Sequence, residues 1–109
     1  MKFMVSEVSD IEALTHEIRA FAQSRDWEQY HTPKNLVMAV AGEAGELAAE
    51  LQWFTPQEAD PQALSAEKRR SIMLEIADVQ IYLLRLADVL DIDVASAVRE
   101  KLTINESRF

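Results

Sequence analysis

Four acidic side chains form two pairs, each with a spacing of three residues. Glu43 and Glu46 lie in Gly-Glu-Ala-Gly-Glu, and Glu75 and Asp78 lie in Glu-Ile-Ala-Asp. Because a helix advances about 100° per residue, acids three residues apart lie one turn apart on nearly the same face. If both segments are helical, each pair presents two carboxylates to the same neighbour.

Both pairs lie beside an apolar helical face. On a helical wheel for residues 33–54, Glu43 falls about 20° from the apolar stripe, which comprises Leu36, Val40, Leu47, Leu51 and Phe54. In residues 66–90, Glu75 lies about 20° from Leu86, and Asp78 is one step further round. We therefore expect both pairs to lean toward the core.

Carboxylates gathered in this way need a counter-charge. Two of them about 6 Å apart repel by roughly 3 kcal/mol at an effective dielectric constant near 20, so some must protonate or a cation must sit among them. The chain has no cysteine and only two histidines. An all-oxygen site of this kind suits Mg²⁺ or Mn²⁺ before Zn²⁺. Because bound Mg²⁺ often shares its coordination with substrate phosphates, the acids indicate chemistry on a phosphate ester or anhydride.

Composition predicts one all-α domain over residues 1–109. The sequence is 49% hydrophobic and has only two glycines and three prolines, and its Ala, Leu and Glu favour helix. The net charge of −8 argues against a nucleic acid polymer as partner. With no cysteine, no leader-like start, and Arg85 and Asp88 interrupting the longest apolar stretch, we expect a cytoplasmic protein outside the membrane.

Capping residues predict where the helices begin, including the two that carry the acid pairs. Ser9 with Glu12, Thr32 before Pro33, Ser65 and Asp93 are each typical of a helix start. The sequence therefore predicts four helices in a bundle-like arrangement, over residues 10–25, 33–54, 66–90 and 94–106. Residues 1–8 are a lead-in, and 25–32 and 55–64 are loops.

Aromatic residues near these helices have two interpretations each. Trp27 and Tyr30 seal the end of the bundle, or Trp27 and His31 line a ligand pocket and contact a base. Trp53 caps the core or forms a wall of that pocket. Tyr82 shares the acidic face one turn after Asp78, or it is a core-edge tyrosine with its hydroxyl in water.

Three polar residues of the last predicted helix and the two glycines also have two interpretations each. Lys101, Asn105 and Arg108 lie on one face of the last helix, as a solvated strip or as a site for polyphosphate. Gly42 and Gly45 lie inside a helix, where each costs roughly 1 kcal/mol relative to alanine. They leave room for a neighbouring helix or for ligand backbone contact beside Glu43 and Glu46. His16 is expected at the surface.

The motifs resemble those of the MazG-like, all-α nucleoside triphosphate pyrophosphatases. The matching motifs are Glu-x-x-Glu, Glu-x-x-Asp and the terminal Lys-x-x-x-Asn-x-x-Arg. Residues 25–31, 33–36, 50–53 and 78–83 resemble the dCTP pyrophosphatase branch in particular. The resemblance departs at Ile18, where that branch has a pocket histidine, so the preferred base stays open.

The resemblance implies hydrolysis of the α–β anhydride of dCTP, or of a related or modified dNTP, to a nucleoside monophosphate and pyrophosphate. It implies Mg²⁺, with Mn²⁺ as an alternative, held by Glu43, Glu46, Glu75 and Asp78. It implies a nucleotide site that includes Trp27, His31, Trp53, Tyr82, Lys101, Asn105 and Arg108. It also implies a homo-oligomer, a tetramer or a dimer, whose pockets are shared between subunits.

A mechanism follows from the metal and the acids together. Glu43 and Glu46 are the expected catalytic residues, with Glu46 or Glu50 deprotonating a water. A di-iron carboxylate bundle is less consistent, because those sites use Glu-x-x-His pairs. The remaining alternative is a non-enzymatic helical interaction module whose acids only keep the surface soluble.

Overall fold

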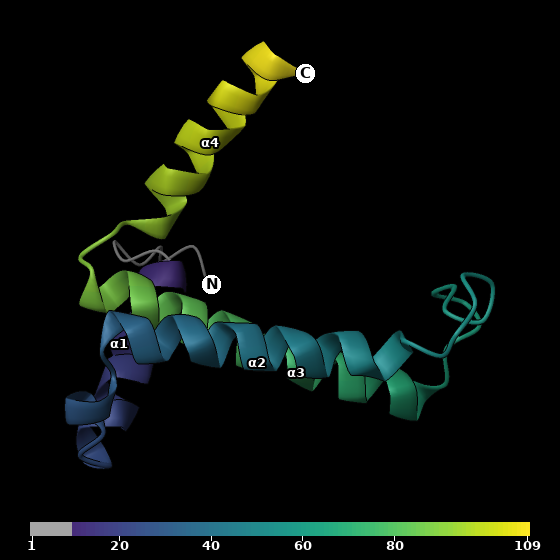
Figure 1. Cartoon of the computed structure of the whole chain (residues 1–109), viewed down its shortest axis with the longest axis horizontal. Coiled ribbons are helices and arrows are strands. Elements are labelled where there is room, and N and C mark those ends of the chain that lie inside the picture. The colour runs from purple at the N-terminus through teal and green to yellow at the C-terminus, as the bar shows by residue number, and fades with distance from the viewer. Residues whose placement is uncertain (1–9) are drawn as a thin grey trace, which may run out of the picture. The chain divides into compact units, whose positions relative to one another are not determined.

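The structure is a computed structural model, and it describes residues 10–109. Within them the chain forms four α-helices and one short 3-10 helix, with no strand: α1 (Asp10–Ser24), η1 (Glu28–Tyr30), α2 (Pro33–Leu51), α3 (Ala66–Val89) and α4 (Val94–Arg108) (Figure 1). The expectation of an all-α fold is confirmed. The predicted cap at Ser9 and the lead-in at 1–8 lie outside the described residues.

Side-chain caps begin two of these helices where the sequence predicts them. The Ser65 hydroxyl accepts a hydrogen bond from the Lys68 backbone N–H at 3.0 Å. The Asp93 carboxylate accepts one from the Ser96 backbone N–H at 2.9 Å. Each satisfies a backbone donor that has no partner within the first helical turn. The third predicted start, at Pro33, also agrees with the first residue of α2.

Helices α1 and α3 end in the same backbone motif. Asp26 and Asp91 have φ values of 58° and 57°, in the left-handed region. The next residue then turns back: Trp27 N–H donates to the Ala22 carbonyl at 2.9 Å, and Ile92 N–H donates to the Ala87 carbonyl at 2.8 Å. These bonds occupy carbonyls that the helix leaves free, and they stop each helix at a defined residue.

Helix α2 ends at Leu51, so the predicted extension to residue 54 is wrong. Phe54 N–H donates to the Leu51 carbonyl at 3.0 Å, which closes a turn. Thr55 and Glu58 then hydrogen-bond reciprocally, backbone to side chain, at 2.9 and 3.1 Å. The Thr-x-x-Glu spacing at 55–58 is the sequence signal for this capping box, and it indicates a turn before residue 55.

The chain divides into two compact units. The first contains residues 10–33 and Leu84–Phe109, and the second is Lys34–Leu83. In the second unit, α2 and α3 run side by side in opposite directions, joined at one end by residues 52–65 (Figure 1). This hairpin of helices is what positions the acids. The assignment of residues 1–109 to a single domain stays a prediction.

Few apolar side chains are fully buried. Among the described residues, the buried hydrophobic positions are Ala22, Leu36, Leu84 and Ala87. Large apolar residues with substantial exposure include Trp53 at 86% and Leu102 at 59%. Helix α4 has no buried residue. No helix in residues 10–109 is long and apolar enough to cross a membrane.

Candidate active site

Three of the four predicted metal ligands meet between α2 and α3. Glu43 comes from α2, and Glu75 and Asp78 come from α3. One carboxylate oxygen of each lies within 4.8 Å of the others. The helical hairpin therefore brings Glu43 of α2 opposite Glu75 and Asp78 of α3, and these last two share one face of their helix, as their three-residue spacing predicts. We call Glu43, Glu75 and Asp78 the acidic cluster.

The acidic cluster has the properties of a cation site. Glu75 Oε1 is buried and has no hydrogen-bond partner. Burying a carboxylate oxygen without a partner is costly, and a bound cation would supply the missing interaction. The donors are all carboxylate oxygens, which suits Mg²⁺ or Mn²⁺. The residues therefore fit a hard divalent ion.

Burial and mutual repulsion perturb two of these acids. Burial raises the pKa of Glu75, and the negative charges of Glu46, Asp78, Glu43 and Glu50 raise it further. Burial likewise raises the pKa of Glu43, followed by the charges of Glu46 and Asp78. Both shifts favour a proton on the carboxyl group when no metal is present. A divalent cation would remove this preference, because it stabilises the ionised forms.

Glu46 lies outside the acidic cluster but close to it. Its side chain is exposed, and it is the largest source of charge repulsion acting on both Glu43 and Glu75. The structure thus brings three of the predicted ligands together and leaves the fourth carboxylate beside them.

Glu50, the other predicted base, is already paired. Lys68 Nζ contacts Glu50 Oε1 at 3.0 Å and the Glu50 backbone carbonyl at 3.1 Å. The same ammonium lies 5.2 Å from the centre of the Phe54 ring. Lys68 therefore joins the end of α2 to the start of α3 and partly neutralises Glu50.

The predicted aromatic residues of the first unit form a contiguous group. The Phe21 and Trp27 rings meet edge to face with their centres 5.6 Å apart, and the Trp27 and His31 rings are tilted with centres 6.2 Å apart. The predicted loop at 25–32 contains η1, and the backbone N–H of His31 donates to the Glu28 carbonyl at 3.2 Å. Trp27 and His31 therefore share one face of a folded segment.

The sequence reasoning missed a charged network that contacts His31. Arg85 is buried at 5% exposure, and its Nε donates to His31 Nδ1 at 3.0 Å. Arg85 also donates to Asp88 at 2.9 Å, and Asp88 accepts a two-pronged contact from Arg19. The available signal was the position of Arg85 and Asp88 in an otherwise apolar helical stretch.

The remaining predicted nucleotide residues lie on three different segments. In the second unit, Tyr82 is half-buried one turn after Asp78, and Trp53 lies in a hollow lined also by Phe54, Glu58 and Ala63. In the first unit, α4 carries Lys101, Asn105 and Arg108, of which Asn105 is half-buried. The Arg108 guanidinium lies 5.1 Å from the centre of the Phe109 ring.

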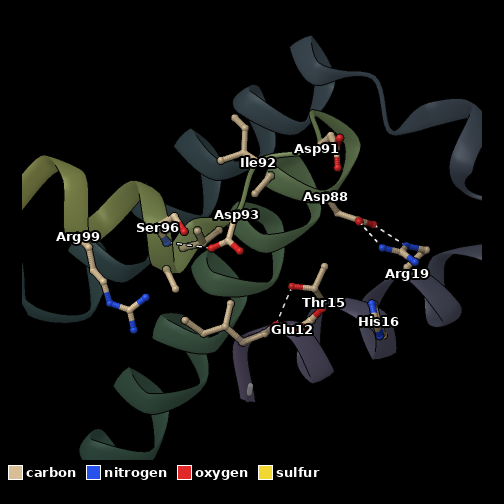
Figure 2. Close-up of a pocket in the computed structure, with 14 residues that line it drawn as sticks. Glu12, Thr15, His16, Arg19, Asp88, Asp91, Ile92, Asp93, Ser96 and Arg99 are labelled. Carbon is tan, nitrogen blue, oxygen red and sulfur yellow. Dashed lines mark hydrogen bonds and ion pairs between the residues drawn. The ribbon is translucent and has the colours of Figure 1, made fainter. Parts of the chain in front are cut away.

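A larger cavity occurs in the first unit. Its volume is about 580 Å³, and it is lined by α1, the end of α3 and the start of α4. Figure 2 shows Arg19 reaching Asp88 at its edge and Asp93 capping α4 at Ser96. His16 lines it and is exposed, as the sequence predicts. None of the predicted site residues lines this cavity.

Comparison with known proteins finds relatives that carry the same name. No protein-family model matches the sequence. The chain is 41% identical over 108 residues to dCTP pyrophosphatase 1 of Homo sapiens, a match that covers 99% of this chain and 64% of the human protein. It is 39% identical over 107 residues to the Bos taurus protein of the same name, over 98% of this chain and 63% of that protein. The chain thus spans less than two thirds of the length of these relatives.

A solved structure gives the more complete match. A pyrophosphatase from Archaeoglobus fulgidus superimposes with a TM-score of 0.85 at 36% sequence identity, and the match covers 96% of each chain. Fold, acidic motifs and relatives agree on the class, an all-α pyrophosphatase. The chain belongs to the MazG-like, all-α nucleoside triphosphate pyrophosphatase family. Within that family its mammalian relatives are dCTP pyrophosphatases.

Proposed function

We propose that this chain hydrolyses a deoxynucleoside triphosphate, dCTP or a related or modified dNTP, to the monophosphate and pyrophosphate. The observation that carries the proposal is the meeting of Glu43, Glu75 and Asp78 within 4.8 Å, with Glu75 Oε1 buried and unpartnered. The names of its relatives, dCTP pyrophosphatase 1 and a pyrophosphatase, support the reaction class.

The acidic cluster would hold the metal, with Glu46 as a further ligand or neighbour. When bound, Mg²⁺ or Mn²⁺ would neutralise triphosphate charge and polarise the reacting phosphorus. The chain itself fixes the positions of the carboxylates, because Glu43 and Glu75 project from two helices that Lys68 connects at one end by its hydrogen bonds to Glu50. The ligands are thus in place before substrate arrives, so little ordering accompanies binding.

Glu46 is the better general base of the two candidates. Glu50 is paired with Lys68 at 3.0 Å, so its carboxylate oxygen is already engaged and is not free to orient a water. Glu46 is exposed, adjoins the acidic cluster and has no ion pair among the salt bridges of the described residues. In this mechanism Glu46 orients a water and takes its proton as the water attacks phosphorus. Pyrophosphate is the leaving group.

The nucleotide would be bound by the aromatic and cationic residues. Flat rings at Trp27, Trp53 and Tyr82 suit stacking on a base, and His31 suits a hydrogen bond to the base or sugar. Lys101, Asn105 and Arg108 supply the positive charge and hydrogen-bond donors that a polyphosphate needs. Specificity among bases is decided by these few contacts.

The active form would be a homo-oligomer, a tetramer or a dimer, with pockets completed by a second copy. Trp53 at 86% exposure and Leu102 at 59% are large apolar side chains left in water by a single chain. Large apolar side chains left exposed on each unit are typical of surfaces that become buried in an interface. Burying it between copies would add the hydrophobic contacts that the small core lacks.

A nucleotide panel tests the reaction directly. Purified protein is mixed with each dNTP and NTP in the presence of Mg²⁺, and pyrophosphate and monophosphate are measured together. We expect equal amounts of both products, highest with dCTP or a modified analogue. Glu43→Gln should abolish turnover while the control Glu17→Gln, on exposed α1, retains it. Release of orthophosphate without pyrophosphate would contradict the proposed reaction.

A further inference from the structure

His31 makes a hydrogen bond that fixes which of its nitrogens carries hydrogen. Arg85 Nε is always a donor, and it lies 3.0 Å from His31 Nδ1. An arginine cannot accept, so Nδ1 must be the unprotonated nitrogen. In the neutral ring the hydrogen then resides on Nε2. His31 therefore offers one donor, on the side of the ring away from Arg85.

The arginine that makes this bond is itself held in place. Arg85 has 6% side-chain exposure and donates from NH1 to Asp88 Oδ2 at 2.9 Å. Arg19 Nε donates to the same oxygen at 2.8 Å, and its NH2 contacts Asp88 Oδ1. Asp88 thus accepts from two guanidinium groups, one on α1 and one on its own helix. The Arg85 guanidinium is planar, so its bond from NH1 to Asp88 also restricts where its Nε can point.

The charge balance of this network keeps His31 neutral. Two guanidinium groups share one carboxylate, so the network retains one positive charge beside the imidazole. Burial lowers the pKa of His31, the charge of Arg85 lowers it further, and Glu28 opposes both. Asp88 remains ionised, because its hydrogen bond with Arg19 is the largest cause of its lowered pKa. The Trp27 ring also lies against the His31 ring, with the ring centres 6.2 Å apart.

We propose that Arg85 is a positioning residue for substrate selection: it locks His31 as a neutral donor from Nε2, and that donor recognises a hydrogen-bond acceptor on the base or sugar of the nucleotide. This inference rests on the proposed function, which assigns His31 to the nucleotide. It goes further by naming the chemistry that His31 reads. A carbonyl, ring nitrogen or hydroxyl oxygen fits the donor, and an amino group at the same place is rejected because two donors meet.

The tautomer is observable without substrate. Long-range ¹H–¹⁵N spectra of the labelled full chain distinguish protonated from unprotonated ring nitrogens, and His16 gives a second set of signals in the same sample. At neutral pH we expect a single His31 form, with hydrogen on Nε2 alone. In Arg85→Met, which keeps an unbranched stem and leaves Asp88 paired with Arg19, both tautomers should appear. A His31 that carries hydrogen on Nδ1 in the unsubstituted protein would overturn the proposal.

A double-mutant cycle tests whether Arg85 acts through His31. Arg85→Met should lower kcat/KM about tenfold, mainly through KM, as expected for the loss of one oriented hydrogen bond. His31→Gln presents an amide N–H near the place of Nε2–H and should retain most of the activity. In the His31→Gln background, Arg85→Met should change kcat/KM by less than about twofold. Equal effects in both backgrounds would contradict the proposal.

Two controls separate the possible failures. Arg70→Met removes an exposed arginine from the same helix and should leave both the spectrum and kcat/KM unchanged. If the unsubstituted chain releases no pyrophosphate, the proposed function fails, and the role of Arg85 fails with it. If the chain is active but His31 shows no fixed tautomer, only the role of Arg85 is contradicted.

Discussion

At the scale of single residues, Glu75 is the carboxylate most dependent on a partner that the chain does not supply. Its Oε1 is buried without a hydrogen bond, and four other acids raise its pKa after burial does. Such an arrangement is unfavourable for an apo-protein and favourable for one that binds a cation. The two states should therefore respond differently to pH.

Stability of the metal-free protein should fall as pH rises above about 4.5, the ordinary value for glutamate. The folded-state pKa of Glu75 is raised, so the folded protein binds more protons than the unfolded chain between the two values. Its stabilising contribution is present below 4.5 and is lost as pH rises through the raised value. Urea unfolding in EDTA at several pH values measures this trend.

Glu75→Gln provides the matched comparison for that trend. The variant lacks the titrating group, so the difference in unfolding free energy between it and the unsubstituted chain should grow in favour of the variant as pH rises. Saturating Mg²⁺ should remove the difference or reverse it. A difference that does not change with pH would contradict the assignment of Glu75 to a repulsive cluster.

The choice of general base is also a question about single residues. Glu46→Gln should lower kcat by at least about a hundredfold, the usual contribution of proton transfer to a positioned carboxylate. Glu50→Gln should lower it by less than about tenfold, because Glu50 is already paired with Lys68. Steady-state pyrophosphate release measures both. The reverse order of effects would transfer the role to Glu50.

Sequence spacing was informative about the acids and silent about their neighbours. Glu75 and Asp78 follow helical periodicity, so their shared face was predictable from residue separation alone. That Glu43 of α2 meets them depends on how the two helices pack. The contact between Arg85 and His31 joins residues 54 positions apart. Such a contact depends on how segments pack, which no local pattern encodes.

At the scale of helices, boundaries were predictable where a side chain caps the backbone. Ser65 and Asp93 make the expected caps. The end of α2 was placed three residues too late, because apolar periodicity continues through Phe54 while Lys68 binds the Glu50 carbonyl. A helix ends where its last carbonyls find other donors, and Lys68 lies 18 residues further along the chain.

Replacing either of two aspartates at helix ends with glycine should stabilise the fold. Asp26 and Asp91 have positive φ, which costs a non-glycine residue about 1 kcal/mol. Asp26→Gly and Asp91→Gly should each raise the free energy of unfolding by up to about that amount, measured by urea denaturation. Ser24→Gly, inside the last turn of α1, should lower it by about 1 kcal/mol. Destabilisation by both aspartate changes would contradict the left-handed caps.

The two glycines of α2 should behave differently in stability and in activity. A Cβ at Gly42 or Gly45 would meet nothing else in its own unit within 4 Å. Packing against α3 thus gives no reason for a glycine, and room for ligand beside Glu43 and Glu46 is the remaining interpretation. Gly42→Ala and Gly45→Ala should each raise stability by about 1 kcal/mol and lower kcat/KM. Thermal melts and pyrophosphate assays separate the two effects. Destabilisation by either alanine would contradict the finding that a Cβ at these positions meets nothing else in its own unit within 4 Å.

At the scale of the whole molecule, the exposed apolar surface predicts self-association. Among the described residues, only four hydrophobic side chains are buried. Sequence predicted an oligomer only through family resemblance, because composition does not say which apolar residues stay exposed. Light scattering coupled to gel filtration should give two or four times the chain mass. A monomer at micromolar concentration that retains full activity would contradict shared pockets.

The central claim is that two helices hold a divalent cation among Glu43, Glu75 and Asp78. The most direct test is the melting temperature as Mg²⁺ is added, because a ligand that binds only the folded state must raise it. We predict a saturable rise for the unsubstituted chain and for the surface control Glu17→Gln, and none for Glu75→Gln. An unchanged melting temperature in the unsubstituted chain, or an equal rise in Glu75→Gln, would contradict the metal site and the hydrolase mechanism built on it.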